Sequence, residues 1–313
     1  MSRPGFDALS NESSRGVPRR GMRRGEAAPR PTAPGPGASR PQAAAGPPPQ
    51  RPEPVQQRAA PRIPAVLPPN AVDDAWGNLP CVPLNTPNLE RHRIIAATRE
   101  DPAHGTFDVL RSRLLSTLKE NGWSRVAITS PTRECGKSFL AANLAISLSR
   151  AERVRTVLMD LDLRDPGLAK LLGVADPGIL RRFLSGRATV KDHFRRFGEN
   201  DLGVGRTLAL ALNEHVESDP AELLFAPGTD AALAAMQEAL RPDVVLFDLP
   251  PALCHDDLLA FQRHVDGVLL VAGGGVTRAE EIEEVSRRLA HDKPLLGVVL
   301  NRAEGTTLSR HCD

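Results

Sequence analysis

The stretch Ser-Pro-Thr-Arg-Glu-Cys-Gly-Lys-Ser occupies residues 130–138, between an apolar run at 126–129 and a helical pattern at 139–148. A strand, a turn ending in Gly-Lys-Ser and a helix are typical of a loop that binds nucleotide phosphates, because the N–H groups at a helix start attract anions. Lys137 would reach the β- and γ-phosphates, and the Ser138 hydroxyl would bind Mg²⁺. The usual pattern has Gly six residues before the Lys, where this chain has Pro131. An ordinary strand-to-helix turn with an exposed lysine is therefore the alternative.

Two apolar runs further along the chain end in aspartate. Residues 157–159 lead into Asp160 and Asp162, and residues 244–247 lead into Asp248. Aspartates two positions apart leave the same face of a strand end, and ligands of open α/β sheets bind outside the carboxyl ends of the strands. Helix caps or turns are the alternative roles for such residues. The sequence predicts one Mg-nucleotide site formed by Lys137, Ser138, Asp160, Asp162 and Asp248.

The rest of the chain alternates between strand and helix patterns. The expected strands are residues 126–130, 154–161, 207–212, 243–249, 267–272 and 295–300. The expected helices are residues 107–118, 137–150, 167–173, 178–185, 220–226, 229–240, 256–264 and 277–290. This alternation predicts an α/β fold, a P-loop NTPase-like parallel sheet with helices on both faces and right-handed crossovers.

The N-terminal part has a different composition. Residues 1–70 hold 16 of the 29 Pro, eleven Arg, no Lys and four acidic residues, a net charge of +7 in a chain of net charge +2. Such a segment cannot bury enough apolar surface to offset its ordering entropy. We expect a disordered basic Pro/Ala/Arg-rich tail and linker over residues 1–90, a folded domain over 91–305 and a short C-terminal tail over 306–313. Deletion through Leu89 should then leave the melting temperature nearly unchanged.

Several functional classes are disfavoured by composition. No apolar run approaches the ~20 residues needed to span a bilayer, and the start lacks the apolar stretch of a secretory signal. The four Cys share no metal-ligand spacing. The tail could contact anionic lipid, nucleic acid or an acidic partner, or serve only as a solvated tether. Its only aromatic residue is Phe6, so no specific nucleic acid is expected as a ligand. A cytoplasmic location is expected.

The order of motifs resembles the bacterial tyrosine kinases (CpsD/CapB-like) of capsular and exopolysaccharide biosynthesis, in the P-loop deviant-Walker ATPase superfamily. The similarity spans about residues 94–303. Its specific pieces are Asp-Leu-Asp-Leu-Arg-Asp-Pro at 160–166 and Asp-Pro-Ala-Glu-Leu-Leu at 219–224. Further matching pieces are Phe-Asp-Leu-Pro-Pro at 247–251 and Gly-Val-Val-Leu-Asn-Arg at 297–302.

The resemblance implies particular roles and partners. One carboxylate of Asp160 and Asp162 would accept the proton of an incoming tyrosine hydroxyl, the pair would order Mg²⁺ and its waters, and Asp248 would complete the metal shell. The implied catalytic residues are Lys137, Asp160, Asp162 and Asp248, and the implied metal ligands are Ser138, Asp160, Asp162 and Asp248. The implied ATP contacts are Thr132, Arg133, Glu134, Cys135, Gly136, Lys137, Ser138, Phe139, Asn301 and Arg302. A membrane-spanning polysaccharide chain-length regulator (Wzz-like) is the implied partner, which would hold the protein at the inner membrane as a peripheral component.

The chain departs from the family at four places. It contains no Tyr, so tyrosine autophosphorylation in cis is impossible and any tyrosine substrate would act in trans. The oligomerisation motif Glu-x-x-Arg-x-x-Arg aligns with Gly105, Asp108 and Arg111, so only the last Arg is present. Glu134 replaces a usual Gly, and its carboxylate must point away from phosphate. Cys135 replaces a usual Glu, either as a thiol activated at a helix N-terminus or simply as a small side chain that fits. A homo-oligomer remains possible.

Two function classes, and a weaker third, are therefore open. One is Mg-dependent phosphoryl transfer from ATP to a partner tyrosine. Another is an ATP-hydrolysing regulatory switch of a polysaccharide-export complex without kinase activity. The weaker third is a Min/Par-type partition ATPase, whose second lysine early in the loop is replaced here by Pro131.

Overall fold

A computed structural model describes residues 71–97, 104–151, 153–289 and 293–303. Its centre is a six-stranded sheet in the order β5-β3-β6-β2-β7-β8, in which all neighbouring strands are parallel. The strands are β2 (Arg125–Thr129), β3 (Thr156–Asp160), β5 (Leu208–Ala211), β6 (Val244–Asp248), β7 (Gly267–Gly273) and β8 (Leu295–Asn301). All six agree with the predicted strands to within two residues.

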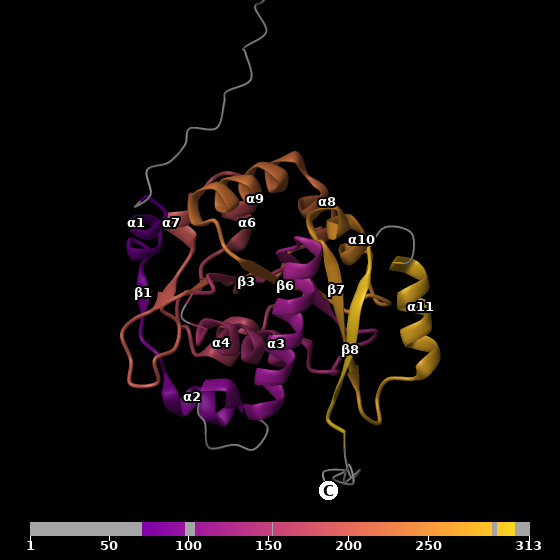
Figure 1. The fold of residues 1–313 in the computed structure, drawn as a ribbon. Coiled ribbons are helices and arrows are strands. Elements are labelled where there is room, and N and C mark those ends of the chain that lie inside the picture. Colours follow the sequence, from indigo (N-terminus) through magenta and orange to yellow (C-terminus); the bar gives the residue numbers. More distant parts are fainter. Residues whose placement is uncertain (1–70, 98–103, 152, 290–292, 304–313) are drawn as a thin grey trace, which may run out of the picture. The chain divides into compact units, whose positions relative to one another are not determined.

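Helices cover both faces of this sheet (Figure 1). One apolar cluster joins it to α2 (Thr86–Arg91), α3 (His104–Asn121), α4 (Lys137–Ser149) and α5 (Leu168–Leu172). The other joins it to α1 (Ala71–Gly77), α6 (Leu180–Leu184), α9 (Pro227–Leu240), α10 (Asp257–Phe261) and α11 (Ala279–Leu289). Alternate residues of β2, β3, β5, β6 and β7 enter opposite clusters, as the two-residue period of a strand requires. The prediction of a P-loop NTPase-like parallel sheet with helices on both faces is confirmed.

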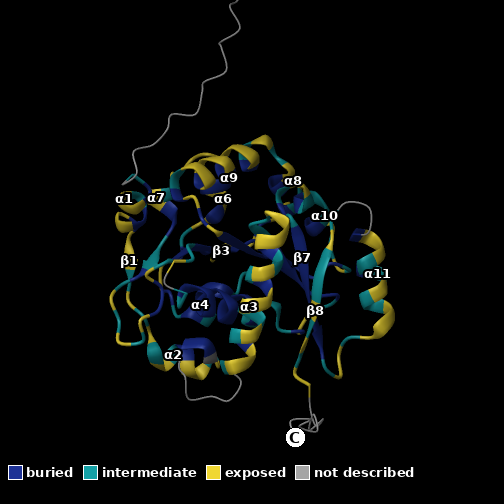
Figure 2. Cartoon of the chain, in the orientation of Figure 1, coloured by how far each residue is buried: buried dark blue, intermediate teal, exposed yellow. Residues whose placement is uncertain are grey.

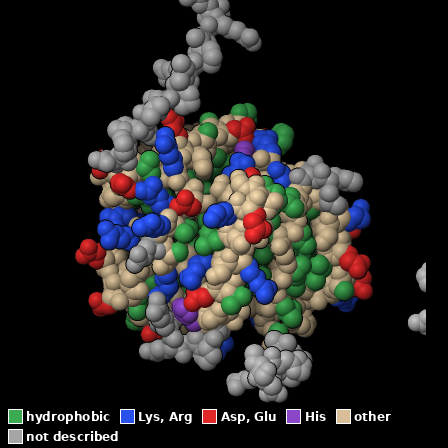
Figure 3. Space-filling model, viewed as in Figure 1, with side chains coloured by type: hydrophobic (Ala, Val, Ile, Leu, Met, Phe, Trp, Pro, Cys, Tyr) green, Lys and Arg blue, Asp and Glu red, His purple; other side chains and the backbone are tan. Residues whose placement is uncertain are grey.

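The remaining elements are short. They are α7 (Val190–His193), α8 (Pro220–Phe225), the 3₁₀ helices η1 (Ile95–Ala97) and η2 (Gln262–His264), and the paired parallel strands β1 (Cys81–Val82) and β4 (Arg196–Phe197). Helix α4 is the most deeply placed helix, because every residue from Leu140 to Ser149 is buried (Figure 2). Strand β8 forms an edge, where Val298 and Leu300 are exposed and hydrophobic side chains gather on the surface (Figure 3). None of the helices in the described ranges could cross a membrane.

The expectation of a disordered tail over residues 1–90 is wrong for residues 71–90. Residues 1–70 and 304–313 lie outside the described residues, but residues 71–90 form α1, β1 and most of α2. The indole of Trp76 is buried, and its Nε1–H donates to the Leu240 carbonyl at 2.7 Å. Leu79 and Leu89 are also buried. The most Pro-rich part of the sequence ends near residue 70. Burial of these few apolar side chains is enough to attach residues 71–90 to the domain.

Strand register brings the predicted site together. In the β3–β6 pair Asp160 lies opposite Asp248, and in the β2–β6 pair Asp248 lies opposite Ile128, two residues before the loop at 130–138. The three strands are neighbours in the sheet, although residues 130–155 separate β2 from β3 along the chain and residues 161–243 separate β3 from β6. Their carboxyl ends therefore place the loop and both aspartate motifs at one edge of the sheet.

Candidate functional site

The loop at residues 130–138 is clamped at its start to the loop that follows β6. The amide N–H groups of Ala252 and Leu253 donate to the carbonyls of Ser130 and Pro131, at 2.8 and 3.1 Å. The Thr129 hydroxyl donates to the Pro250 carbonyl at 2.7 Å. The first loop residues accept the two backbone bonds through their carbonyl groups. Pro131 has no N–H group, and none is needed for these hydrogen bonds. The departure from the usual Gly at this position is compatible with the loop structure.

The loop ends at Gly136, the N-cap of α4, in a left-handed conformation with φ 88°. Glu134 also has a positive φ, 64°, which is uncommon for a residue with a Cβ atom. Its side chain is exposed, as expected for a carboxylate that must avoid a phosphate. The backbone conformation of Glu134 is therefore energetically unfavourable, and its side chain places a negative charge at the rim of the loop.

Replacing Glu134 by glycine is expected to tighten ATP binding severalfold, because it removes a carboxylate and relaxes a conformation that costs about 1 kcal/mol. Glu134→Ala is the matched control, since it removes the charge but keeps the Cβ atom at positive φ. Calorimetric affinities and melting temperatures of both variants separate the two contributions. Equal stability of the Gly and Ala variants would contradict the backbone part of this prediction.

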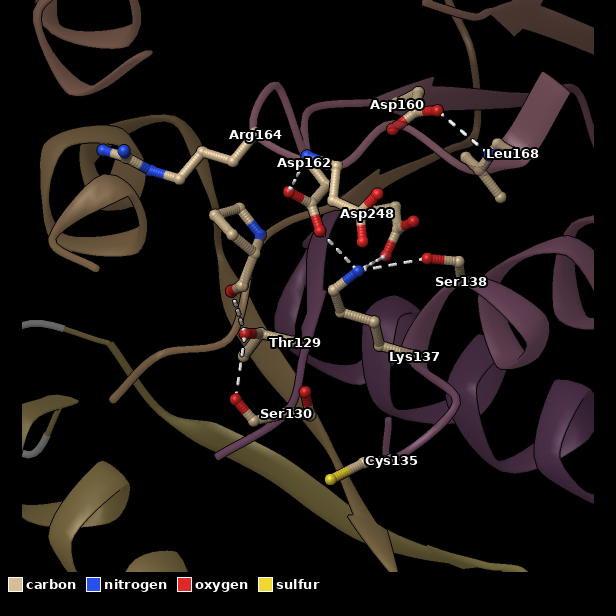
Figure 4. Close-up of polar contacts among 12 residues, drawn as sticks. Thr129, Ser130, Cys135, Lys137, Ser138, Asp160, Asp162, Arg164, Leu168 and Asp248 are labelled. Carbon is tan, nitrogen blue, oxygen red and sulfur yellow. Dashed lines mark hydrogen bonds and ion pairs between the residues drawn. The ribbon is translucent and has the colours of Figure 1, made fainter. Parts of the chain in front are cut away.

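Lys137 is the cation at the centre of the carboxylates (Figure 4). Its Nζ lies 2.7 Å from Asp162 Oδ2 and 3.9 Å from Asp248 Oδ1, and it donates to the Ser138 hydroxyl at 3.1 Å. Burial alone would lower the pKa of Lys137, but the carboxylates of Asp248 and Asp162 raise it above its ordinary value. The lysine therefore stays charged, and the reading of an exposed lysine in an ordinary turn is wrong: its side chain is 12% exposed.

The two aspartates of the first motif have different surroundings. Asp160 is fully buried, and its Oδ2 accepts from the Leu168 N–H at 3.1 Å, at the start of α5. Asp162 lies beside Lys137 and lines a cavity, whereas Asp160 does not. Burial raises the pKa of Asp160 well above its ordinary value, and the Asp248 carboxylate adds to the effect. We expected both side chains to leave the same face of the strand end. In the structure Asp162 points towards Lys137, whereas Asp160 turns towards α5.

Buried carboxylate oxygens without hydrogen bonds remain at this edge. They are Oδ1 of Asp160 and both side-chain oxygens of Asp248. Burial raises the pKa of Asp248 to about 6, against the opposing effect of Lys137. Buried acceptors of this kind normally have partners. Three carboxylates surround Lys137, so the residues present fit a divalent cation that prefers oxygen ligands.

No group of three or more His, Cys, Asp or Glu within the described ranges is arranged to hold a metal ion by itself. Magnesium usually keeps several waters and uses one or two carboxylates together with substrate phosphates. Ser138, Asp162 and Asp248 lie close enough to Lys137 to share such an ion, while Asp160 lies behind them. The donor set suits Mg²⁺ bound together with a nucleotide better than a metal held by protein alone.

A cavity of about 310 Å³ opens beside these residues. Most of the predicted nucleotide contacts line it, and Thr132, Asn301, Asp160 and Asp248 do not. Its wall consists of Ser130, Arg133, Glu134, Cys135, Gly136, Lys137, Ser138, Phe139, Asp162, Arg164, Asp165, Leu171, Pro250, Pro251, His255 and Arg302. The volume is at the lower end of the range for small-molecule sites.

Residues that the sequence did not single out complete the wall. Arg164 forms two hydrogen bonds to the buried Asp257 carboxylate, at 2.7 and 3.1 Å, and so joins the loop after β3 to the start of α10. Arg164 belongs to the quoted Asp-Leu-Arg-Asp-Pro motif, so its importance could have been suspected. No sequence signal pointed to Asp257 or His255.

Comparisons with known proteins agree with this geometry. Residues 126–312 match the family described as the CobQ/CobB/MinD/ParA nucleotide binding domain, and the chain belongs to that family. The succinoglycan biosynthesis transport protein ExoP of Rhizobium meliloti is 31% identical over 195 residues, 60% of this chain and 23% of ExoP. The tyrosine-protein kinase YwqD of Bacillus subtilis is 29% identical over 208 residues, 66% of this chain and 83% of YwqD.

Solved structures of bacterial tyrosine kinases are also similar to this chain. The kinase domain of the Escherichia coli tyrosine kinase ETK aligns with a TM-score of 0.58 and 25% identity, over 68% of this chain and 82% of that domain. The resemblance to the bacterial tyrosine kinases is thereby confirmed. The chain spans less than a third of the length of the first curated relatives that it matches.

Proposed function

We propose that this chain binds MgATP at the carboxyl edge of β2, β3 and β6 and transfers the γ-phosphoryl group to a tyrosine of another polypeptide. The observation that supports this most strongly is the set of buried oxygens of Asp160 and Asp248 that accept no hydrogen bond, beside the Lys137–Asp162 ion pair. Phosphoryl transfer needs positioning and charge stabilisation rather than covalent chemistry from the protein. A buried cluster of one lysine and three carboxylates suits that requirement.

The residues take distinct parts in this proposal. Loop N–H groups and Lys137 bind the phosphates. Ser138 and Asp248 would hold Mg²⁺, which neutralises phosphate charge when bound. Asp162 lines the cavity, whereas Asp160 is turned to α5. Asp162 is therefore the carboxylate that would accept the proton of the tyrosine hydroxyl, and Asp160 would fix the loop after β3 through the Leu168 N–H.

The acceptor tyrosine lies outside these 313 residues, because none of them is a tyrosine. ExoP is named for succinoglycan biosynthesis and transport, and YwqD is named a tyrosine-protein kinase. These names favour a role in exopolysaccharide or capsule polymerisation and export. A membrane-spanning chain-length regulator is the partner that would recruit the protein to the inner membrane and present a substrate.

Replacing Asp162 by asparagine is expected to lower the rate of phosphotyrosine formation by about 10²- to 10⁴-fold, the usual contribution of a general base. The assay incubates the protein with MgATP and the cytoplasmic part of the membrane regulator, and detects phosphotyrosine by mass spectrometry. Asp165→Asn is the matched control, because Asp165 also lines the cavity but is exposed and makes no contact with Lys137. Its rate should stay close to that of the parent.

The absence of tyrosine from the chain also favours a second candidate, an ATP-hydrolysing switch of the export complex without kinase activity. In that case the same residues would order Mg²⁺ and a water molecule. Release of free phosphate from ATP, with no phosphotyrosine on any partner, would contradict the kinase proposal and leave this switch.

A further inference from the structure

The turn between β7 and α11 lies directly against the back of the phosphate loop. A Cβ atom built on Gly273 would lie 3.2 Å from the Cα of Cys135, and one built on Gly274 would lie 2.5 Å from the Arg302 carbonyl oxygen. Real Cβ atoms do not approach a backbone atom as closely as the second distance. The Gly-Gly pair therefore lets this turn fit between the phosphate loop and the end of β8.

A chain of polar contacts runs from this turn into the loop. The Gly273 N–H donates to the Thr277 hydroxyl oxygen at 2.9 Å, and that hydroxyl lies 3.3 Å from the Cys135 sulfur. The Cys135 thiol in turn lies 3.3 Å from the Thr132 carbonyl, which can only accept. One direction satisfies every group: Gly273 N–H to Thr277, Thr277 O–H to Cys135, and Cys135 S–H to Thr132. Hydrogen bonds aligned in this way strengthen one another.

Asn301 holds the next peptide group of the loop. Its Nδ2 donates to the Cys135 carbonyl at 2.9 Å. In a trans peptide the carbonyl and the following N–H point in opposite directions, so this bond turns the Gly136 N–H away from Asn301. A Cβ atom on Gly136 would lie 2.1 Å from the same Nδ2. Asn301 thus occupies the space that a side chain at 136 would need, and one of its amide N–H groups is used by the loop.

We infer that Thr277 and Asn301 are positioning residues that hold the Cys135–Gly136 peptide in its phosphate-binding conformation. Thr277 acts through the Cys135 side chain and Asn301 through the Cys135 carbonyl. Neither side chain lines the cavity, and the observed contact of Asn301 is with the loop itself. The inference rests on the proposed nucleotide binding, and it gives Cys135 a structural role in place of that of a reactive thiol.

Binding measurements test the part of this inference that concerns the phosphates. Loss of one hydrogen bond in Thr277→Val or Asn301→Ala is expected to weaken binding roughly two- to twelvefold, equally for MgATP, MgGTP and magnesium tripolyphosphate. Thr277→Ser should restore the parent affinity. Thr207→Val is the matched control, because the Thr207 hydroxyl donates to the Ser149 carbonyl at 3.1 Å, before β5 at the opposite edge of the sheet. If Asn301→Ala weakens ATP but leaves tripolyphosphate unchanged, Asn301 contacts the base and the inference is wrong.

Thiol reactivity tests the same contacts without nucleotide, so its outcome is independent of the proposed function. In a background with Cys81, Cys254 and Cys312 replaced by serine, Cys135 is the only thiol. It is 1% exposed, so its reaction with a disulfide reagent reports opening of the loop. Thr277→Val should accelerate this reaction severalfold, and Thr277→Ser should not. An unchanged rate in Thr277→Val would overturn the inference, whereas failure of the parent protein to bind any triphosphate would instead overturn the proposed function.

Discussion

Replacing Lys137 by methionine is expected to abolish measurable ATP binding and to destabilise the nucleotide-free domain by about 3–5 kcal/mol, the usual cost of removing one partner of a buried ion pair. From sequence alone, the lysine could be taken for a residue that serves only the ligand. The structure gives it a second role, because it is the cation within 4 Å of Asp162 and Asp248 among the described side chains. Without it, the carboxylates at this edge repel one another in a buried setting.

The pH dependence of this variant identifies the cause. Burial raises the pKa of Asp248 to about 6 and that of Asp160 well above its ordinary value, and loss of Lys137 raises both further. The variant's folded state therefore binds protons more tightly than that of the parent, so the stability lost relative to the parent is largest at high pH and shrinks as the pH falls towards about 6, where Asp248 of the parent is itself half protonated. Urea unfolding across this range measures it.

A double variant provides the control. Lys137→Met combined with Asp162→Asn removes both members of the 2.7 Å pair, so it should recover part of the lost stability at about pH 7 without recovering ATP binding. A single variant as stable as the parent at neutral pH would contradict the assigned electrostatics of the site.

Deleting residues 1–89 is expected to lower the unfolding free energy by more than the 3–5 kcal/mol typical of truncating one buried tryptophan. Trp76 is buried beside α9 and bonded to the Leu240 carbonyl, and the deletion also removes the buried Leu79 and Leu89. This result would reverse the expectation, drawn from composition, that the domain begins at residue 91. Thermal and urea unfolding of the truncated protein measure the loss.

Deletion of residues 1–70 is the comparison, because their composition predicts no contribution to a core. It should leave the melting temperature close to that of the full chain. Trp76→Ala in the full chain separates loss of the indole from loss of the whole segment, and should cost about 3–5 kcal/mol. Equal melting temperatures for the two deletions would show that α1, β1 and α2 add nothing to the stability of the domain.

The positions of the six strands, and the meeting of the site residues at one edge of the sheet, could be predicted from the sequence. Buried parallel strands are continuous apolar runs, and each of the six is bounded by turn or helix signals, so their positions could be predicted closely. The aspartates that follow β3 and β6 and the Gly-Lys-Ser that follows β2 lie at the carboxyl ends of those strands. Because parallel strands share that edge, the site could be predicted before the strand order was known.

Other features depend on tertiary contacts that no local pattern encodes. The segment at 71–90 is short and contains three Pro, and it belongs to the domain through the burial of side chains such as Trp76, Leu79 and Leu89. The different directions of Asp160 and Asp162 follow from the Leu168 N–H at the start of α5. The contact of Cys135 with Thr277 joins residues 142 positions apart, so sequence alone offered Cys135 as either a reactive thiol or a small side chain that fits.

Calorimetric titration of the full chain with ATP, in the presence of Mg²⁺ and again with excess EDTA, tests the central claim most directly. The proposed site predicts one ATP bound per chain with Mg²⁺, much weaker binding with EDTA, and no detectable binding to Lys137→Met under either condition. Magnesium is required because Asp248 and Asp160 present buried carboxylate oxygens without hydrogen bonds, which would repel the phosphates of a nucleotide bound alone. Binding of equal strength with EDTA, or in Lys137→Met, would contradict the assignment of this edge of the sheet as the MgATP site.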